Sequence, residues 1–114
     1  MAAPSSQPQL EPFGVRVTPE RDAVRVTPSG ELDLATVRQL DDQLRALRDA
    51  GFRDFILDLR ELTFMDSTGL KLILTHDASA REDGIRFSLV AGGAAVQRVF
   101  QVSGVVERLP FRRS

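Results

Sequence analysis

Ser67 is the residue whose type and position could carry chemistry. It stands in Met65-Asp66-Ser67-Thr68-Gly69 at an expected strand-to-helix junction, where a serine needs a nearby base to act as a nucleophile. The single histidine, His76, follows nine residues later on the same expected helix, roughly 13 Å along the axis and on the opposite side. No Gly-x-Ser-x-Gly elbow surrounds Ser67. We therefore expect no serine hydrolase, and we interpret His76 as a half-exposed helix residue.

Three aspartates offer a second route to chemistry. Asp33, Asp58 and Asp66 fall near expected strand ends that could share one rim of a sheet, where they would hold Mg²⁺ or transfer protons. The alternative is structural: Asp33 and Asp66 cap helices, and Asp58 satisfies backbone donors. We favour the structural interpretation, because capping alone explains two of the three positions.

The remaining composition excludes further classes of site. Gly92 and Gly93 precede a helix, but no phosphate-loop pattern accompanies them. The chain has no cysteine and one histidine, which removes disulfide scaffolds, thiol catalysis and nearly every zinc site. Lys plus Arg number 15 against 16 for Asp plus Glu, so the charge of -1 gives no reason to expect nucleic acid or an anionic membrane as a partner. We expect no enzyme, no cofactor and no bound metal.

Length and composition predict the domain organisation of the chain and its location in the cell. The 114 residues, 42% hydrophobic and 27% charged, suit one folded domain, which we place over residues 13–114 after a disordered tail over residues 1–12. That tail lacks the basic and apolar segments of a secretory signal. No stretch approaches the roughly 18 apolar residues of a membrane span. We expect a cytoplasmic protein.

The apolar pattern predicts an α/β fold, with a mixed sheet of four to five strands, an initial hairpin and three or more helices. The hairpin strands cover residues 13–18 and 24–27, and Pro28, Ser29 and Gly30 are expected to end the second strand. A helix with Asp33 as its N-cap should run to Gly51 and bury an apolar stripe of Val37, Leu40, Leu44 and Leu47.

The second half of the chain continues the alternation of strands and helices. A buried central strand is expected over residues 55–59 and another strand over residues 85–90. A second helix opens at Asp66 and ends at Gly84, and a third ends at Gly104 before a short final strand or turn over residues 105–109. The side chains expected to point inward from these two helices are Leu70, Ile73, Leu74, Ala78, Ala80, Val96, Val99 and Phe100.

The segment between the central strand and the second helix is interpreted as a loop. Leu62, Phe64 and Met65 would anchor it, while Asp66, Ser67 and Thr68 present polar groups at a helix N-terminus. Unpaired N–H groups and the positive end of the helix dipole suit a phosphate there, so Ser67 is fitted to be a switch. The alternative is that Ser67 only helps to start the helix.

Four motifs in order resemble those of the sulphate-transporter and anti-sigma-factor-antagonist (STAS) domain, over roughly residues 13–109. The signature-like segment is Phe64-Met65-Asp66-Ser67-Thr68-Gly69-Leu70. The others are Gly30-Glu31-Leu32-Asp33, Ile56-Leu57-Asp58-Leu59, and Val96-Gln97-Arg98-Val99-Phe100 with Gly104. The resemblance implies a STAS-like fold.

The resemblance also implies a function, that of a bacterial anti-sigma factor antagonist. Such a domain binds an anti-sigma factor that is also a serine kinase, and so frees a sigma factor for transcription. Phosphorylation of the serine after the motif aspartate abolishes binding, and a phosphatase restores it. Carried onto this chain, Ser67 is the acceptor and Thr68 a second candidate. The implied partner-binding residues are Asp33, Met65, Asp66, Ser67, Thr68 and Gly69.

Two other functions fit the same sequence. STAS-like subunits also dock to membrane transport complexes without phosphorylation, and the surface around Ser67 would then hold an ATPase or permease. A small-ligand or nucleotide sensor, using Asp33, Asp66 and Ser67, is the third possibility.

Overall fold

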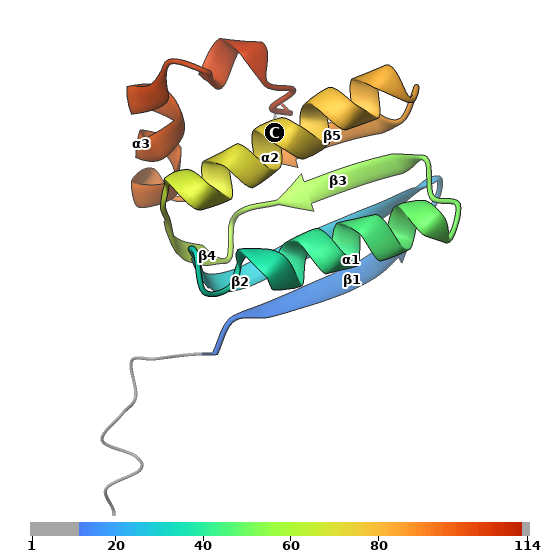
Figure 1. The fold of residues 1–114 in the computed structure, drawn as a ribbon, viewed down its shortest axis with the longest axis horizontal. Coiled ribbons are helices and arrows are strands. Elements are labelled where there is room, and N and C mark those ends of the chain that lie inside the picture. The colour runs from blue at the N-terminus through green and yellow to red at the C-terminus, as the bar shows by residue number, and fades with distance from the viewer. Residues whose placement is uncertain (1–11, 113–114) are drawn as a thin grey trace, which may run out of the picture.

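The computed structural model describes residues 12–112, which form five strands and three α-helices (Figure 1). The order along the chain is that of the sequence prediction with one strand added. All but one residue of the predicted tail, residues 1–11, lie outside the described part of the chain. The elements are β1 (Gly14–Glu20), β2 (Ala23–Leu32), α1 (Val37–Asp49), β3 (Asp54–Asp58), β4 (Leu62–Met65), α2 (Ser67–Glu82), β5 (Arg86–Val90) and α3 (Ala94–Ser103).

The predicted initial hairpin is confirmed, since β1 and β2 pair antiparallel with Val17 opposite Val26. The expected end of β2 at Pro28 is wrong, because the strand continues to Leu32. Pro28 lies between two parallel ladders of β2, one with β3 and one with β4 that starts at Gly30. A proline has no N–H to donate, and at this gap neither parallel ladder requires one.

The sheet is mixed, as predicted, in the order β1-β2-β3-β5, and β4 pairs with β2 outside this path. The buried strand β3 lies parallel to both β2 and β5, so it is central. Strand β4 corrects the prediction of a loop before Asp66. Only Leu62 and Met65 are buried in its four residues, so neither an alternating nor a continuous apolar pattern marks it.

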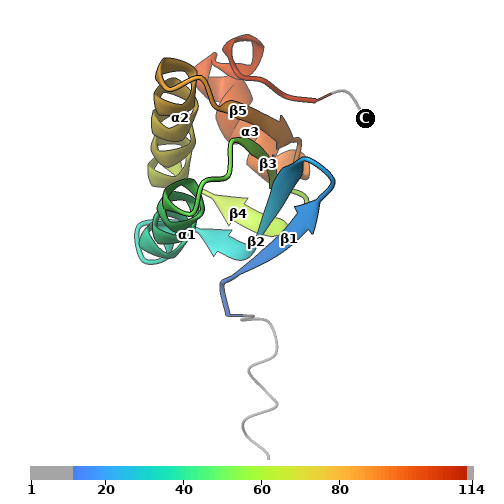
Figure 2. The ribbon, with the colours of Figure 1, turned by 90° about the vertical axis from the view of Figure 1, so that its right-hand side faces the viewer.

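Helices α1 and α2 lie on the same side of the sheet, as the turned view makes plain (Figure 2). Helix α3 packs against β4 and α2. The core is formed where these helices meet the sheet, by large side chains that are at most 2% exposed: Leu32, Leu40, Leu44, Phe55, Leu57, Leu59, Met65, Ile73, Leu89 and Phe100. This core holds α1 and α2 at fixed positions against one face of the sheet.

The C-terminal ends of the helices, which the sequence places at glycines, agree with the prediction better than the start of α1, which the sequence places at Asp33. Gly51 has φ 102°, donates to Arg48 O at 2.9 Å, and is followed by the Phe52 N–H bonding Leu47 O at 3.1 Å. This pair of bonds is a Schellman motif, which closes α1 as predicted. Gly84 and Gly104 also have positive φ beyond α2 and α3.

One side chain of α2 differs from expectation: Ala78 faces solvent rather than the core, while Leu74 is half-buried. Of the strand or turn predicted for the final segment, the structure has the turn, a 3-10 helix η2 (Val106–Arg108), and Phe111 then bridges β5 at Leu89. None of the helices within residues 12–112 has the length and apolar character needed to cross a membrane.

Candidate functional site

Two loops meet at the carboxyl ends of β2 and β4. These strands are parallel with Leu32 opposite Met65, and the Asp66 N–H donates to Leu32 O at 3.1 Å. Because parallel strands end at the same edge, the loop that follows Leu32 and the start of α2 lie side by side. The structure thereby brings the neighbourhood of Asp33 next to Asp66 and Ser67, as the sequence motifs implied.

Asp66 is the N-cap of α2, as predicted. Its Oδ1 accepts from the N–H groups of Thr68 at 2.9 Å and Gly69 at 3.2 Å, and also from the Thr68 hydroxyl. The Thr68 hydroxyl is the largest influence that lowers the pKa of Asp66, and the backbone N–H of Leu34 adds to it from the other loop. The Asp66 carboxylate therefore binds the donors at the start of the helix.

Ser67 is the first residue of α2 and is exposed. Its hydroxyl makes no hydrogen bond within residues 12–112, in contrast to that of Thr68. The single histidine is not placed to serve it as a base, because His76 is buried and its Nε2 lies 2.7 Å from Asp41 Oδ1. The arrangement leaves an accessible hydroxyl at the start of α2.

His76 corrects the expectation of a half-exposed side chain. It is only 7% exposed, because α1 packs over this face of α2 and supplies the carboxylate of Asp41. Burial lowers the pKa of His76, and the hydrogen bond to Asp41 opposes that effect.

Met65 and Gly69 are buried beneath the site rather than displayed on it. Met65 is 2% exposed, and a Cβ added to Gly69 would lie 2.7 Å from Met65 Cγ and 2.9 Å from Leu32 Cδ2. Such distances are shorter than real contacts allow, so only glycine lets α2 begin this close to β4 and β2. Both residues set the position of Ser67 and leave the contact surface to their neighbours.

Asp33 does not cap α1, contrary to prediction. Its Oδ1 accepts from the Ala35 N–H at 3.0 Å in a turn that precedes the helix. The helix starts at Val37 after Thr36, whose hydroxyl turns back to donate to Glu31 O at 2.7 Å. The intervening residue, Leu34, is an exposed apolar side chain at the site that sequence reasoning passed over. Its only signal in the sequence is an apolar residue directly after Asp33, outside the apolar stripe of α1.

Asp58 does not join the other two carboxylates. It is held by the guanidinium groups of Arg60 at 2.8 Å and Arg25 at 2.9 Å, together with the Arg60 N–H at 3.1 Å. These bonds, led by that of the Arg60 side chain, lower the pKa of Asp58 to about 2. No group of three acidic or histidine side chains in residues 12–112 converges as a metal ion requires.

Gly92 and Gly93 have backbone roles. Gly92 donates to Gln97 Oε1 at 2.8 Å, and a Cβ there would lie 2.7 Å from Leu59 O. Gly93 is the N-cap of α3. The absence of a side chain at Gly92 therefore permits the close approach of the two chain segments.

Comparisons with known proteins agree with this architecture. A family model described as "Mlab, STAS domain" matches residues 15–110. The anti-sigma-B factor antagonist of Staphylococcus aureus is 28% identical over 93 residues, which cover 82% of this chain and 86% of that protein.

Two solved structures are similar in fold and sequence. The anti-sigma factor antagonist SpoIIAA in its unphosphorylated form has a TM-score of 0.71 and 26% identity, over 90% of both chains. The Bacillus cell fate determinant SpoIIAA in its phosphorylated form has a TM-score of 0.65 and 25% identity, over 90% of this chain and 93% of the other. With the matched family model spanning the whole sheet and its helices, the chain belongs to the STAS domain family, in which its relatives are anti-sigma factor antagonists.

Proposed function

We propose that this protein is an anti-sigma factor antagonist, which binds an anti-sigma factor that is also a serine kinase and thereby frees a sigma factor. The observation that carries the proposal is the exposed, unbonded hydroxyl of Ser67 at the start of α2, on the rim shared by β2 and β4. The relatives named as anti-sigma factor antagonists support the partner class, and SpoIIAA in phosphorylated form supports the modification. The site of action is then the cytoplasm, where sigma factors work.

We assign the whole of residues 13–114 to one STAS domain. Phe13 and Phe111, near the two ends of the described residues, both pack against the same core cluster. A single cluster that gathers side chains from every strand supports one cooperative unit.

Phosphorylation of Ser67 is proposed to switch the protein off. A phosphate adds about -1.5 to -2 charges at a point where the Asp66 carboxylate already binds the N–H groups of Thr68 and Gly69. The phosphate therefore meets a like charge and finds two first-turn donors occupied. In a desolvated interface a loss of about 4 kcal/mol weakens binding roughly a thousandfold.

Ser67 is in this account a substrate and not a catalyst, and a separate phosphatase reverses its modification. Thr68 is the poorer acceptor, because its hydroxyl already donates to Asp66. Asp33, Asp66, Ser67 and Thr68 supply polar contacts to the partner, and the exposed Leu34 supplies an apolar one. Met65 and Gly69 contribute by holding these residues in place.

The test is the intact mass of the protein purified from its native host under growth and stress conditions. We expect a fraction that is heavier by about 80 Da, the mass of one phosphate, mapped by peptide sequencing to Ser67. The addition should vanish in Ser67→Ala and persist in Thr68→Ala.

A second measurement follows binding. Ser67→Ala should retain the anti-sigma factor in co-purification, whereas Ser67→Glu should lose it. Complete absence of the phosphate under every condition, with a stably bound membrane ATPase or permease, would refute the switch and support the docking-subunit function instead.

A further inference from the structure

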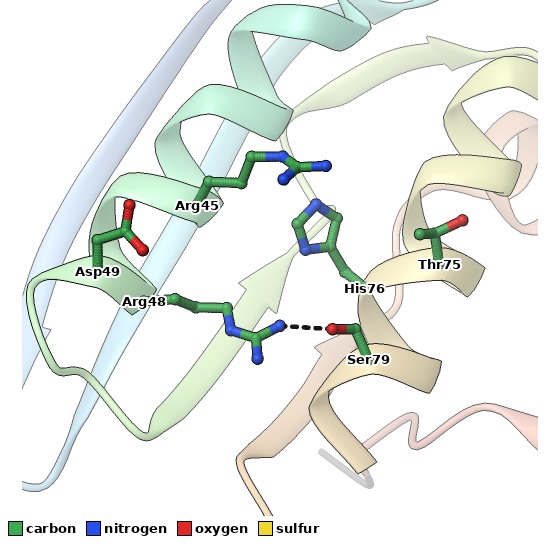
Figure 3. Close-up of a pocket in the computed structure, with 6 residues that line it drawn as sticks. All are labelled: Arg45, Arg48, Asp49, Thr75, His76 and Ser79. Atoms are coloured by element: carbon green, nitrogen blue, oxygen red, sulfur yellow. Dashed lines mark hydrogen bonds between the residues drawn. The ribbon is translucent and has the colours of Figure 1, made fainter. Parts of the chain in front are cut away.

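A groove of about 350 Å³ lies between α1 and α2, on a part of the helix pair that the proposed function does not use (Figure 3). Its centre is His76, which follows Ser67 by nine residues and therefore lies roughly 13 Å farther along the axis of α2. A volume of this size is within the range of small-ligand sites. The lining residues are Arg45, Arg48, Asp49, Thr75, His76 and Ser79.

Hydrogen-bond donors enter the groove from both helices. Arg45 uses its Nε on Asp41 Oδ2 at 2.9 Å, and its two terminal amino groups form no hydrogen bond within residues 12–112. Arg48 donates to Ser79 Oγ at 2.8 Å from across the groove. Figure 3 shows both guanidinium groups extending from α1 toward the His76 ring and the opposite helix. The guanidinium donors of α1 thus face the hydroxyls of Thr75 and Ser79 on α2, a set of groups that can bind the oxygens of a phosphate-class anion.

The ring of His76 adds a polar atom that the protein leaves without a partner. Its Nε2 bonds the Asp41 carboxylate, so we assign the ring proton to Nε2. Nδ1 then has no hydrogen-bond partner within residues 12–112, although the side chain is 7% exposed and lines the groove. Thr27 Oγ1 is the one buried side-chain polar atom without a partner in residues 12–112, so Nδ1 is open to the groove, where water or a ligand can complete its hydrogen bonding.

The charges around the ring decide when a ligand can bind. They come from α1 and from Asp83, which directly follows α2, since the neighbouring sheet residues, Phe55 and Phe87, are apolar. Arg48 is also paired with Asp83, as Arg45 is with Asp41, so the carboxylates outweigh the arginines until His76 takes up a proton. The charged groups concerned are Asp41, Arg45, Arg48, Asp49 and Asp83.

We infer that this groove binds a phosphate-class oxyanion, held by Arg45, Arg48 and the hydroxyls of Thr75 and Ser79. Binding places a proton on Nδ1 of His76, which then donates to the anion. Burial is the main reason that the protonated ring is disfavoured, and the charges of Arg45 and Arg48 add to it; a bound anion stabilises the protonated ring, so affinity rises as the pH falls. The one carboxylate of the lining, Asp49, is exposed and opposes binding.

The test uses NMR of the untagged protein, because its single histidine gives one unambiguous ring signal. Sulfate keeps its charge across the range from about pH 5.5 to pH 8, and it is titrated at constant ionic strength against chloride. We expect saturable shifts of the His76 ring signals and a histidine pKa that is higher in sulfate than in chloride. Inorganic phosphate and glycerol phosphate, titrated separately, show whether the free ion or an ester is preferred, and either preference supports the site.

Variants distinguish this groove from general attraction to a charged surface. Arg45→Gln should weaken sulfate binding by about tenfold, the effect of one charged hydrogen bond. Arg38→Gln makes the same charge change on α1 outside the groove and should alter affinity less than about twofold. Asp49→Asn should strengthen binding. Thr75→Val should weaken sulfate binding, and because Thr75 is exposed we expect this variant to fold.

Two results would overturn the inference. One is a ring signal that does not respond to millimolar sulfate or phosphate at acidic pH while the protein remains folded. The other is an equal loss of affinity in Arg38→Gln and Arg45→Gln. Neither result depends on Ser67, so the proposed switch stands or falls separately.

Discussion

Replacing Asp66 with alanine should lower the free energy of unfolding by about 2 kcal/mol. Replacing an N-cap residue with alanine typically lowers the free energy of unfolding by about 1 kcal/mol, and by up to about 2 kcal/mol at the upper end of the range. The carboxylate here serves the N–H groups of Thr68 and Gly69 and the Thr68 hydroxyl, and it lies at the positive end of the dipole of α2. It also attracts the Leu34 N–H from the adjacent loop, which places the expected cost at the upper end.

Asp33→Ala is the matched control, because Asp33 is the same residue type at the same rim. Its carboxylate serves the Ala35 N–H and the Thr36 hydroxyl in a turn, and it caps no helix. We expect its loss to stay below about 1 kcal/mol. Urea denaturation of the wild type and both variants gives the two values. In thermal melts the Asp66 variant should fall by roughly 8 °C, given about 4 °C for each kcal/mol in a domain of this size.

The pH dependence provides a second check on Asp66. Its pKa is lowered in the folded state, so its contribution is fully present above the unfolded pKa of about 4 and disappears as the pH falls through the folded value. The difference between wild type and Asp66→Ala should therefore be constant at neutral pH and shrink in acid. Equal losses in the Asp66 and Asp33 variants, or a difference that does not change in acid, would refute the capping account.

Three further substitutions have expected outcomes. Gly69→Ala should cost about 1–3 kcal/mol in urea denaturation, because its Cβ collides with Met65; a tolerated alanine would contradict the close packing. Asp58→Asn should cost about 2 kcal/mol at pH 7 and progressively less as the pH falls toward about 2, the folded pKa of Asp58, since its charged bonds to Arg25 and Arg60 are then lost in wild type too. Gly51→Ala should lower the free energy of unfolding by about 1 kcal/mol, because Gly51 has a φ of 102°. Ala78→Gly is the comparison: it exchanges the same two residue types at an exposed position inside a helix.

The sequence predicted those parts of the fold that local patterns determine. The stripe from Val37 to Leu47 defined α1, and Gly51, Gly84 and Gly104 located the helix ends where positive φ occurs. The alternation of apolar strands and helices predicted the α/β arrangement, and the family resemblance implied the role of Ser67.

The parts that sequence could not predict depend on pairing between distant segments. Strand β4 forms because β2 extends far enough to pair with it. The residue pattern of Leu62–Met65 by itself does not indicate this pairing. An aspartate before a helix is ambiguous in the same way: Asp66 caps α2, whereas Asp33 belongs to a turn because Thr36 bonds back to Glu31. Tertiary geometry also decided the burial of His76, which depends on α1.

Strand β2 serves two ladders that are separated by Pro28 and by a register shift between Gly30 and Glu31. Amide protons of the β2–β3 ladder and of the β2–β4 ladder should therefore exchange with solvent at different rates, since a break in one row of bonds need not propagate into the other. We expect the β2–β4 end of the sheet, next to Ser67, to open as a local unit while the central strands stay closed. A kinase that must draw the start of α2 into its own active site would then work against the β2–β4 segment alone, and not against the global stability of the domain.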